Sequence, residues 1–166
     1  MAILKKINDL LSRILNLTIV LAMIGMVVFV FAQVIWRYVL RQPLSWSEEA
    51  SRYLFSYVTL FGAAVLFRDG KHINMSLLVD LVKNPFGKKL IQLFANVCSL
   101  AFLAVIIWYG FPMANKILRF EVLSPSMEWL KMGWIFMMVP VASVLSALML
   151  IEVILSGVAM LGKGEN

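Results

Sequence analysis

The strongest constraint on the fold of this chain is a run of 23 residues without a charge, from Ile14 to Trp36. The hydrocarbon core of a bilayer is about 30 Å thick, and an α-helix needs about 20 residues to cross it. The apolar core of a signal peptide is shorter, roughly 7–15 residues, and no small-residue cleavage site follows this run cleanly. The run therefore predicts a first membrane span that is not removed by cleavage.

Three further apolar stretches indicate that the chain crosses the membrane four times. The four spans are expected at about 14–36, 46–67, 88–110 and 133–156. Gly110 and Pro112 are expected to disturb the third helix at its end. Hydrophobic residues make up 62% of the 166 residues, whereas soluble domains contain about 45–50%. The sequence therefore predicts an all-α membrane protein with four transmembrane helices in a single membrane domain, residues 1–166.

Two shorter segments have the periodicity of amphipathic helices that lie at the membrane surface. Residues 1–13 carry basic side chains among apolar ones at helical spacing, which predicts a basic amphipathic N-terminal segment. Residues 72–83 place four polar side chains on one helical face, namely His72, Ser76, Asp80 and Lys83. About twelve residues are too few to cross the bilayer. The second segment is therefore predicted to be an interfacial helix.

Charged residues at the start of the second span allow two interpretations. Glu48 lies four residues before Arg52 and Glu49 three residues before it, so both carboxylates can face the guanidinium group. The uncharged residues 53–67 cover only about 22 Å, and an unpaired arginine deep in lipid costs about 3 kcal/mol or more. The cluster is either an ion pair that ends the span or a polar contact with a second membrane protein.

The basic residues predict the orientation of the chain. With four spans both termini lie on one side, and that side carries nine Lys and Arg residues against six on the other. The nine are Lys5, Lys6, Arg13, Arg68, Lys71, Lys83, Lys88, Lys89 and Lys163. Because basic loops stay in the cytoplasm, both termini are expected there. All five tryptophans then fall at the outer surface, which indicates either an aromatic belt or an outer docking surface.

Little in the sequence indicates chemistry within this chain. A proton-coupled exporter of this size would need an acidic or basic side chain well inside the membrane, and the first and third spans have none there. Cys98 is the only cysteine and His72 the only histidine, so a thiolate cluster and bis-histidine haem ligation are excluded. We expect no enzyme activity and no catalytic, metal, cofactor or substrate site. The basic residues flank apolar runs, so the net charge of +6 indicates lipids rather than nucleic acid as partners.

Polar and small side chains on the third and fourth spans indicate contacts between helices. Gln92, Asn96 and Ser99 repeat at helical spacing and form a polar stripe on the third span. The fourth span carries a face of small residues, namely Ala142, Ser143, Ser146 and Ala147. Polar and small residues in lipid turn toward other helices. Whether those helices belong to this chain or to a partner stays open at this point.

The pattern around the second span resembles the small membrane subunit of tripartite ATP-independent periplasmic (TRAP) transporters, the DctQ type. The resemblance covers nearly the whole chain and is carried by Trp46, Glu48, Glu49, Arg52, Gly62, Arg68, Gly70, His72 and Ile73, with Arg37-Tyr38 before them and Ser124-Pro125 and Pro140 after them. It implies a bacterial inner-membrane location and two partners. One is a large multi-helix membrane subunit that holds the substrate and sodium sites and moves in an elevator-like cycle. The other is a periplasmic substrate-binding protein.

The resemblance further implies that this chain braces the scaffold of the large subunit and helps to dock the binding protein. The substrate would be an organic acid such as a C4-dicarboxylate or sialic acid. The residues expected at partner interfaces or in structural roles are Arg37, Trp46, Glu48, Glu49, Arg52, Arg68, His72, Gln92, Asn96 and Ser99. Two other functions are kept as alternatives: a stand-alone four-helix transporter or channel-like homo-oligomer, and a membrane assembly factor.

Overall fold

The computed structural model describes residues 2–42, 44–68 and 85–162. Four helices make up most of this part of the chain: α1 (Ala2–Tyr38), α2 (Ser45–Arg68), α4 (Pro85–Arg119) and α5 (Met132–Gly162). All four are long and apolar enough to cross a membrane, which confirms the predicted fold class. The expected interfacial helix at 72–83, with His72, lies outside the described residues.

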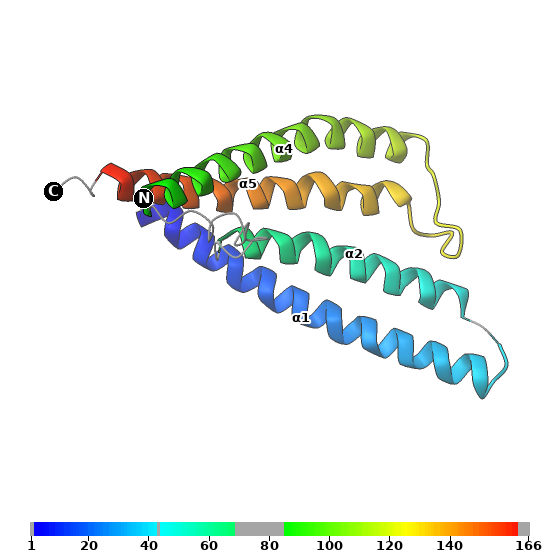
Figure 1. The fold of residues 1–166 in the computed structure, drawn as a ribbon. Helices are drawn as coiled ribbons and strands as arrows, with labels where there is room; N and C mark the ends of the chain where they lie inside the picture. The colour runs from blue at the N-terminus through cyan, green and yellow to red at the C-terminus, as the bar shows by residue number, and fades with distance from the viewer. Residues whose placement is uncertain (1, 43, 69–84, 163–166) are drawn as a thin grey trace.

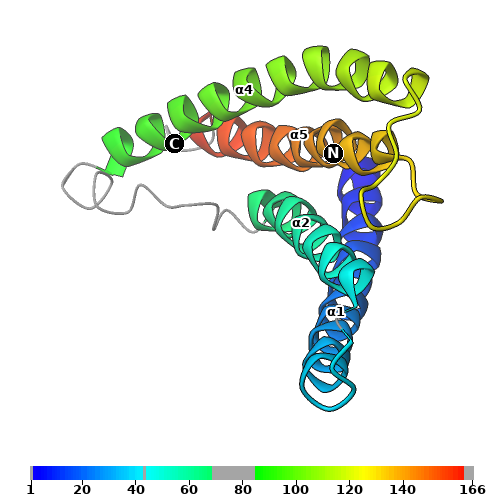
Figure 2. The same cartoon turned by 90° about the vertical axis from the view of Figure 1, so that its right-hand side faces the viewer.

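The helices are arranged side by side in the order α1, α2, α5, α4 (Figure 1). α2 packs between α1 and α5, α5 packs between α2 and α4, and α1 has only a small contact with α5. Among the described helices, α4 packs on α5 alone. Figure 2 shows that the α1–α2 pair and the α4–α5 pair meet at an angle. The result is an open, bent layer instead of a closed four-helix bundle.

The core of this layer is small because each helix has few neighbours within the chain. Its centre is formed by Leu15 on α1, Phe61 and Ala64 on α2, and Ala142 and Met149 on α5. Many other large apolar side chains are exposed along the spans, including most of those on the outer half of α1. Exposed apolar faces of this extent are stable only against lipid tails or against helices of another chain.

Two helices are longer than their apolar runs. Residues 2–13 of the predicted N-terminal segment do not form a separate element. They are the first part of α1, which has 37 residues and is therefore about 55 Å long. Its buried face there consists of Asn8, Ser12 and Leu15, so packing against the other helices holds this segment in line with the span. A helix of this length extends beyond a hydrocarbon core of about 30 Å or tilts within it.

The third span does not end at Gly110 and Pro112, because α4 continues through both residues to Arg119. Gly110 fills a different role. A Cβ atom added there would lie 3.2 Å from Cβ of Pro140, which is buried on α5. The missing side chain therefore lets α4 and α5 approach closely at this level.

The connection between α1 and α2 is a tight turn at the end of the layer opposite the termini. Val39 N donates to Ile35 O at 2.8 Å and Gln42 N donates to Trp36 O at 3.3 Å, so the last turn of α1 is closed by the residues that follow it. Arg41 has a φ of 54°, the left-handed conformation in which the chain reverses. This turn and the α4–α5 connection lie at the same end of the layer (Figure 1), which we call the outer end.

Candidate functional site

Residues 120–131, here called the outer loop, join α4 to α5 at the outer end and are held in a closed shape. Met132 N donates to Val122 O at 2.8 Å, Ser124 N donates to Leu130 O at 2.9 Å, and Leu123 and Lys131 form an antiparallel bridge. Lys131 Nζ also donates to Glu121 Oε1 at 2.5 Å. This hydrogen bond, together with the ammonium charge, lowers the pKa of the Glu121 carboxyl group. The outer loop is therefore an ordered element.

Glu49 ties the outer loop to α2. Glu49 as a whole residue is 8% exposed. It accepts hydrogen bonds from the hydroxyl group of Tyr53, from Ser124 Oγ at 2.5 Å and from Ser126 N at 2.9 Å. Tyr53, four residues further along the same helix, also lies 3.3 Å from Ser124 Oγ and 3.7 Å from Sδ of Met132. A buried carboxylate is stable only when several donors satisfy it, and here two of its donors belong to the outer loop.

The neighbouring carboxylate, that of Glu48, pairs with Arg52 of the same helix and not with the outer loop. Glu48 Oε1 accepts from Arg52 Nη2 at 2.9 Å, and the two side chains are 60% and 72% exposed. The expectation that both carboxylates could face Arg52 is therefore wrong for Glu49, which bonds to the outer loop. An exposed pair such as Glu48–Arg52 contributes little to stability, about 0–1 kcal/mol. The charges of Glu48 and Arg52 therefore lie at the surface of α2.

Ser47 and Trp46 attach the start of α2 to α1. Ser47 is buried and its Oγ donates to the carbonyl oxygen of Phe29 at 3.0 Å. Trp46 packs edge-on against the ring of Phe29, with ring centroids 5.8 Å apart. Arg37 is exposed at the end of α1. Of the predicted site residues in this region, Trp46 and Glu49 contact other elements, whereas Arg37 is placed at the surface.

A second polar cluster lies at the opposite, inner end, where α1, α2 and α5 meet. Asn8 is fully buried, and its Nδ2 donates to Glu152 Oε2 at 2.6 Å and to the carbonyl oxygen of Leu148 at 3.4 Å. Beside it, Arg68 of α2 forms an ion pair with Asp9 of α1. Sequence reasoning did not identify Asn8 or Asp9. The available signal was the spacing of Asn8, Ser12 and Leu15, which share one helical face.

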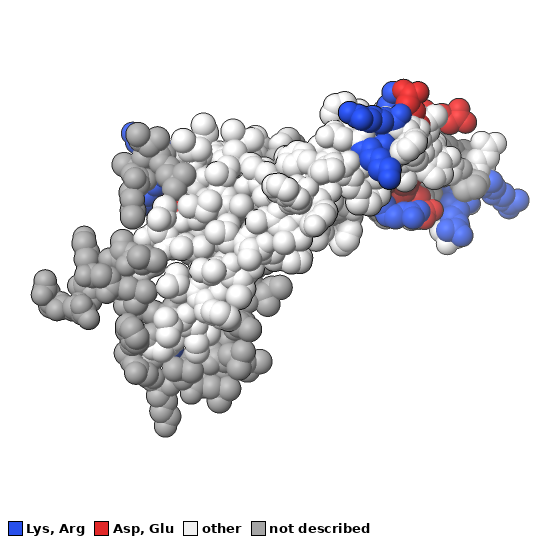
Figure 3. Space-filling model, turned by 90° about the horizontal axis from the view of Figure 1, so that it is seen from above, with Lys and Arg blue, Asp and Glu red and all other residues white. Residues whose placement is uncertain are grey.

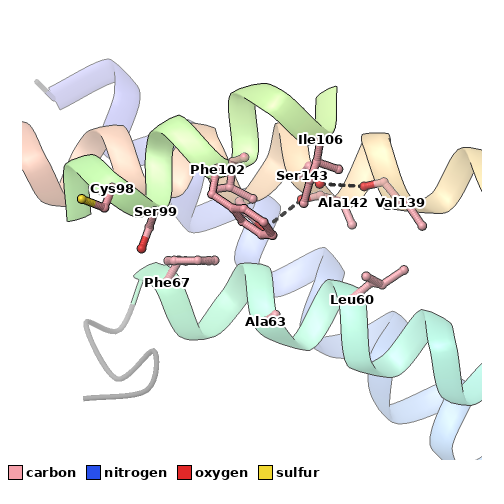
Figure 4. Close-up of a pocket in the computed structure, with 12 residues that line it drawn as sticks. Leu60, Ala63, Phe67, Cys98, Ser99, Phe102, Ile106, Val139, Ala142 and Ser143 are labelled. Carbon is pink, nitrogen blue, oxygen red and sulfur yellow. Dashed lines mark hydrogen bonds between the residues drawn. The ribbon is translucent and has the colours of Figure 1, made fainter. Parts of the chain in front are cut away.

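Between α2 and α4 lies a groove whose floor is α5 (Figure 4). It has a volume of about 490 Å³ and is lined mainly by apolar and small side chains. The walls include Leu60, Ala63 and Phe67 from α2 and Ser99, Phe102 and Ile106 from α4, and the floor includes Ala142, Ser143 and Ser146. The two floor hydroxyls donate to carbonyl oxygens of α5 itself, each at 2.8 Å. The groove therefore presents an apolar surface to its surroundings.

The groove brings together parts of the predicted polar stripe on α4 and of the predicted small-residue face on α5. Ser99 comes from the predicted polar stripe, and the floor comes from the predicted small-residue face. The other stripe residues do not line it, since Gln92 is exposed and Asn96 is half-buried elsewhere on α4. Within the described ranges no three His, Cys, Asp or Glu side chains are grouped to hold a metal ion. The arrangement can pack helices and present an ordered loop.

Three relatives have names that place them in TRAP transporters, two as small permease proteins and one as a longer permease protein. A TRAP transporter small permease protein of Haemophilus influenzae is 24% identical over 164 residues, which cover 97% of this chain and 98% of the relative. The sialic acid TRAP transporter small permease protein SiaQ of Vibrio cholerae is 28% identical over 140 residues, covering 81% of this chain and 79% of SiaQ. The sialic acid TRAP transporter permease protein SiaT of H. influenzae is 31% identical over 144 residues, covering 85% of this chain but 22% of SiaT.

The family model agrees with these relatives and with the four spans. The model of the DctQ component of tripartite ATP-independent periplasmic transporters matches residues 26–160, from the middle of α1 almost to the end of α5. This confirms the resemblance seen in the sequence. The chain therefore belongs to the DctQ family, the small multi-pass membrane subunits of TRAP transporters.

Proposed function

We propose that this chain braces the scaffold of a large TRAP permease subunit during sodium-driven uptake of an organic acid. Support for a large partner comes from SiaT, in which a region similar to this chain makes up 22% of a longer permease. Two relatives are named for sialic acid, so a carboxylate-bearing substrate of this class, or a C4-dicarboxylate, fits the proposal. The substrate and sodium sites would lie in the large subunit.

The observation that carries the proposal is the open layer. Of the helices that the structure describes, α4 packs on α5 alone, and the groove between α2 and α4 is mainly apolar along its walls and floor. Small residues at the floor allow the backbone of another helix to approach closely, which is how helices associate in lipid. In this proposal a helix of the large subunit occupies the groove and extends the layer. A stand-alone transporter would instead need polar or charged groups along a path between its own helices.

The proposed orientation puts the outer end in the periplasm of a bacterial cell and both termini in the cytoplasm. It is supported by the excess of Lys and Arg on the side of the termini. The outer loop then faces the side on which a periplasmic substrate-binding protein would approach. We propose that this end of the chain contributes to docking that protein.

Reconstitution with and without this chain tests the proposed function. We expect the chain to co-purify with a large TRAP subunit from the same organism, and we expect substrate uptake into proteoliposomes only when both subunits and the binding protein are present. The chain reconstituted alone should give no flux. Flux through the chain alone would support the stand-alone transporter, and full uptake by the large subunit without this chain would remove the bracing role.

A further inference from the structure

Glu49 is unusual because it is the buried carboxylate of a pair of neighbouring glutamates. Glu48 is solvated and paired with Arg52, whereas Glu49 is 8% exposed and makes three hydrogen bonds. Two of the donors, Ser124 Oγ and Ser126 N, lie 75 and 77 residues further along the chain. The carboxylate therefore fixes the outer loop on the start of α2.

The loop that Glu49 holds exposes large apolar side chains. Met127 is buried, whereas Trp129 is 79% exposed and Phe120 is 70% exposed. The outer loop lies outside the two candidate spans on either side of it, which end at Arg119 and begin at Met132. Exposed aromatic side chains on an ordered element are the usual anchors of protein–protein contacts.

Charged side chains lie near Trp129 and Phe120 at the outer end. Lys116, Arg119 and Glu128 are exposed on or beside the outer loop. Figure 3 shows that Lys, Arg, Asp and Glu gather at the outer end, while the visible face over the spans carries none. Mixed charge around apolar anchors fits a soluble protein surface better than lipid tails. A partner that approaches from the periplasm meets this end first.

We propose that Glu49 is a positioning residue that holds the outer loop in the conformation that binds the periplasmic substrate-binding protein through Trp129 and Phe120. The inference rests on the proposed function, and it adds which element docks and what sets its shape. A loop ordered before binding loses less conformational freedom when the partner arrives, so it binds more tightly than a free loop.

The test uses the complete complex in proteoliposomes, with Glu49→Gln as the first variant. We expect the variant to co-purify with the large subunit, amide hydrogen exchange of residues 120–131 to increase, and the binding-protein concentration for half-maximal uptake to rise roughly tenfold. Uptake at saturating binding protein should be close to the wild-type value. Glu48→Gln, which removes the same charge one residue away, should leave the exchange of the outer loop unchanged.

Trp129→Ala provides an independent readout, because it alters the proposed contact without touching the Glu49 hydrogen bonds. It should raise the half-maximal concentration while leaving the exchange of residues 122–126 unchanged. A wild-type half-maximal concentration in both variants would overturn the docking role of the outer loop, and unchanged exchange in Glu49→Gln would overturn the positioning role. Loss of co-purification in either variant would instead assign the loop to the large subunit and contradict the proposal. Absence of wild-type uptake would be a failure of the proposed function itself.

Discussion

Replacing Gly133 by alanine is expected to separate α4 from α5 at the outer end and to lower the stability of the chain. A Cβ atom at position 133 would lie 2.3 Å from Cγ of Leu118 and 2.8 Å from the backbone nitrogen of Leu118. The side chain of Leu118 could move, but its backbone cannot without shifting α4. Overpacking of this kind costs about 1–3 kcal/mol, which should appear as a lower thermal transition of the purified chain in detergent.

Gly62→Ala is the matched control for this prediction. A Cβ atom at position 62 of α2 meets nothing within 4 Å in the described structure. Alanine also favours the helix over glycine by about 0.5–1 kcal/mol, so this variant should be as stable as wild type or more stable. Equal transitions for Gly133→Ala and Gly62→Ala would show that the close α4–α5 contact does not form.

Asn8→Asp is expected to destabilise the inner end by about 3 kcal/mol. The substitution replaces a buried amide donor, which lies 2.6 Å from Glu152 Oε2, with a second carboxylate. Two ionised carboxylates at this distance repel each other, so the pair must take up a proton before a hydrogen bond can form between them, and this uptake costs free energy at neutral pH. The thermal transition of the variant should therefore fall at neutral pH and recover as the pH is lowered, because protonation of one carboxyl group restores a donor.

The double variant Asn8→Asp with Glu152→Gln tests the cause of this loss. The amide of the glutamine can donate to the new aspartate, so the hydrogen bond between α1 and α5 is restored with its direction reversed. Most of the stability should return at neutral pH. If the double variant is as unstable as Asn8→Asp alone, the contact between positions 8 and 152 does not determine the stability of this region.

The four membrane-spanning helices could be predicted, because a long uncharged run in a membrane protein crosses the bilayer as a helix. The ends of α1 and α4 could not be predicted from the sequence. The sequence of residues 1–13 is polar enough to predict a surface segment, whereas in the structure Asn8 and Ser12 are buried against other helices and residues 2–13 continue the span. At Pro112 the sequence indicates a break, yet α4 continues to Arg119. Packing against α5 outweighs the lost backbone hydrogen bond.

The arrangement of the site depended on contacts that are distant in sequence. From spacing alone, both Glu48 and Glu49 could pair with Arg52. Glu49 instead accepts hydrogen bonds from Ser124 and Ser126, which lie 75 and 77 residues further along the chain. The order α1, α2, α5, α4 also depends on contacts between distant parts of the sequence, because no local sequence pattern predicts that α2 packs on α5. The small-residue face and Ser99 were recognised as contact residues, but their meeting in one groove required the fold.

The most direct test of the bracing role uses Cys98, the only cysteine of the chain. It is exposed on α4 and lines the groove between α2 and α4. Labelling by a membrane-permeant maleimide can be compared between the chain alone and its complex with a cysteine-free large subunit, with Cys98→Ser as the background control. With both samples in the same detergent, we predict that Cys98 is labelled much more slowly in the complex than in the isolated chain. Equal labelling rates in the two samples would contradict the account, because the groove would then be filled by lipid in both.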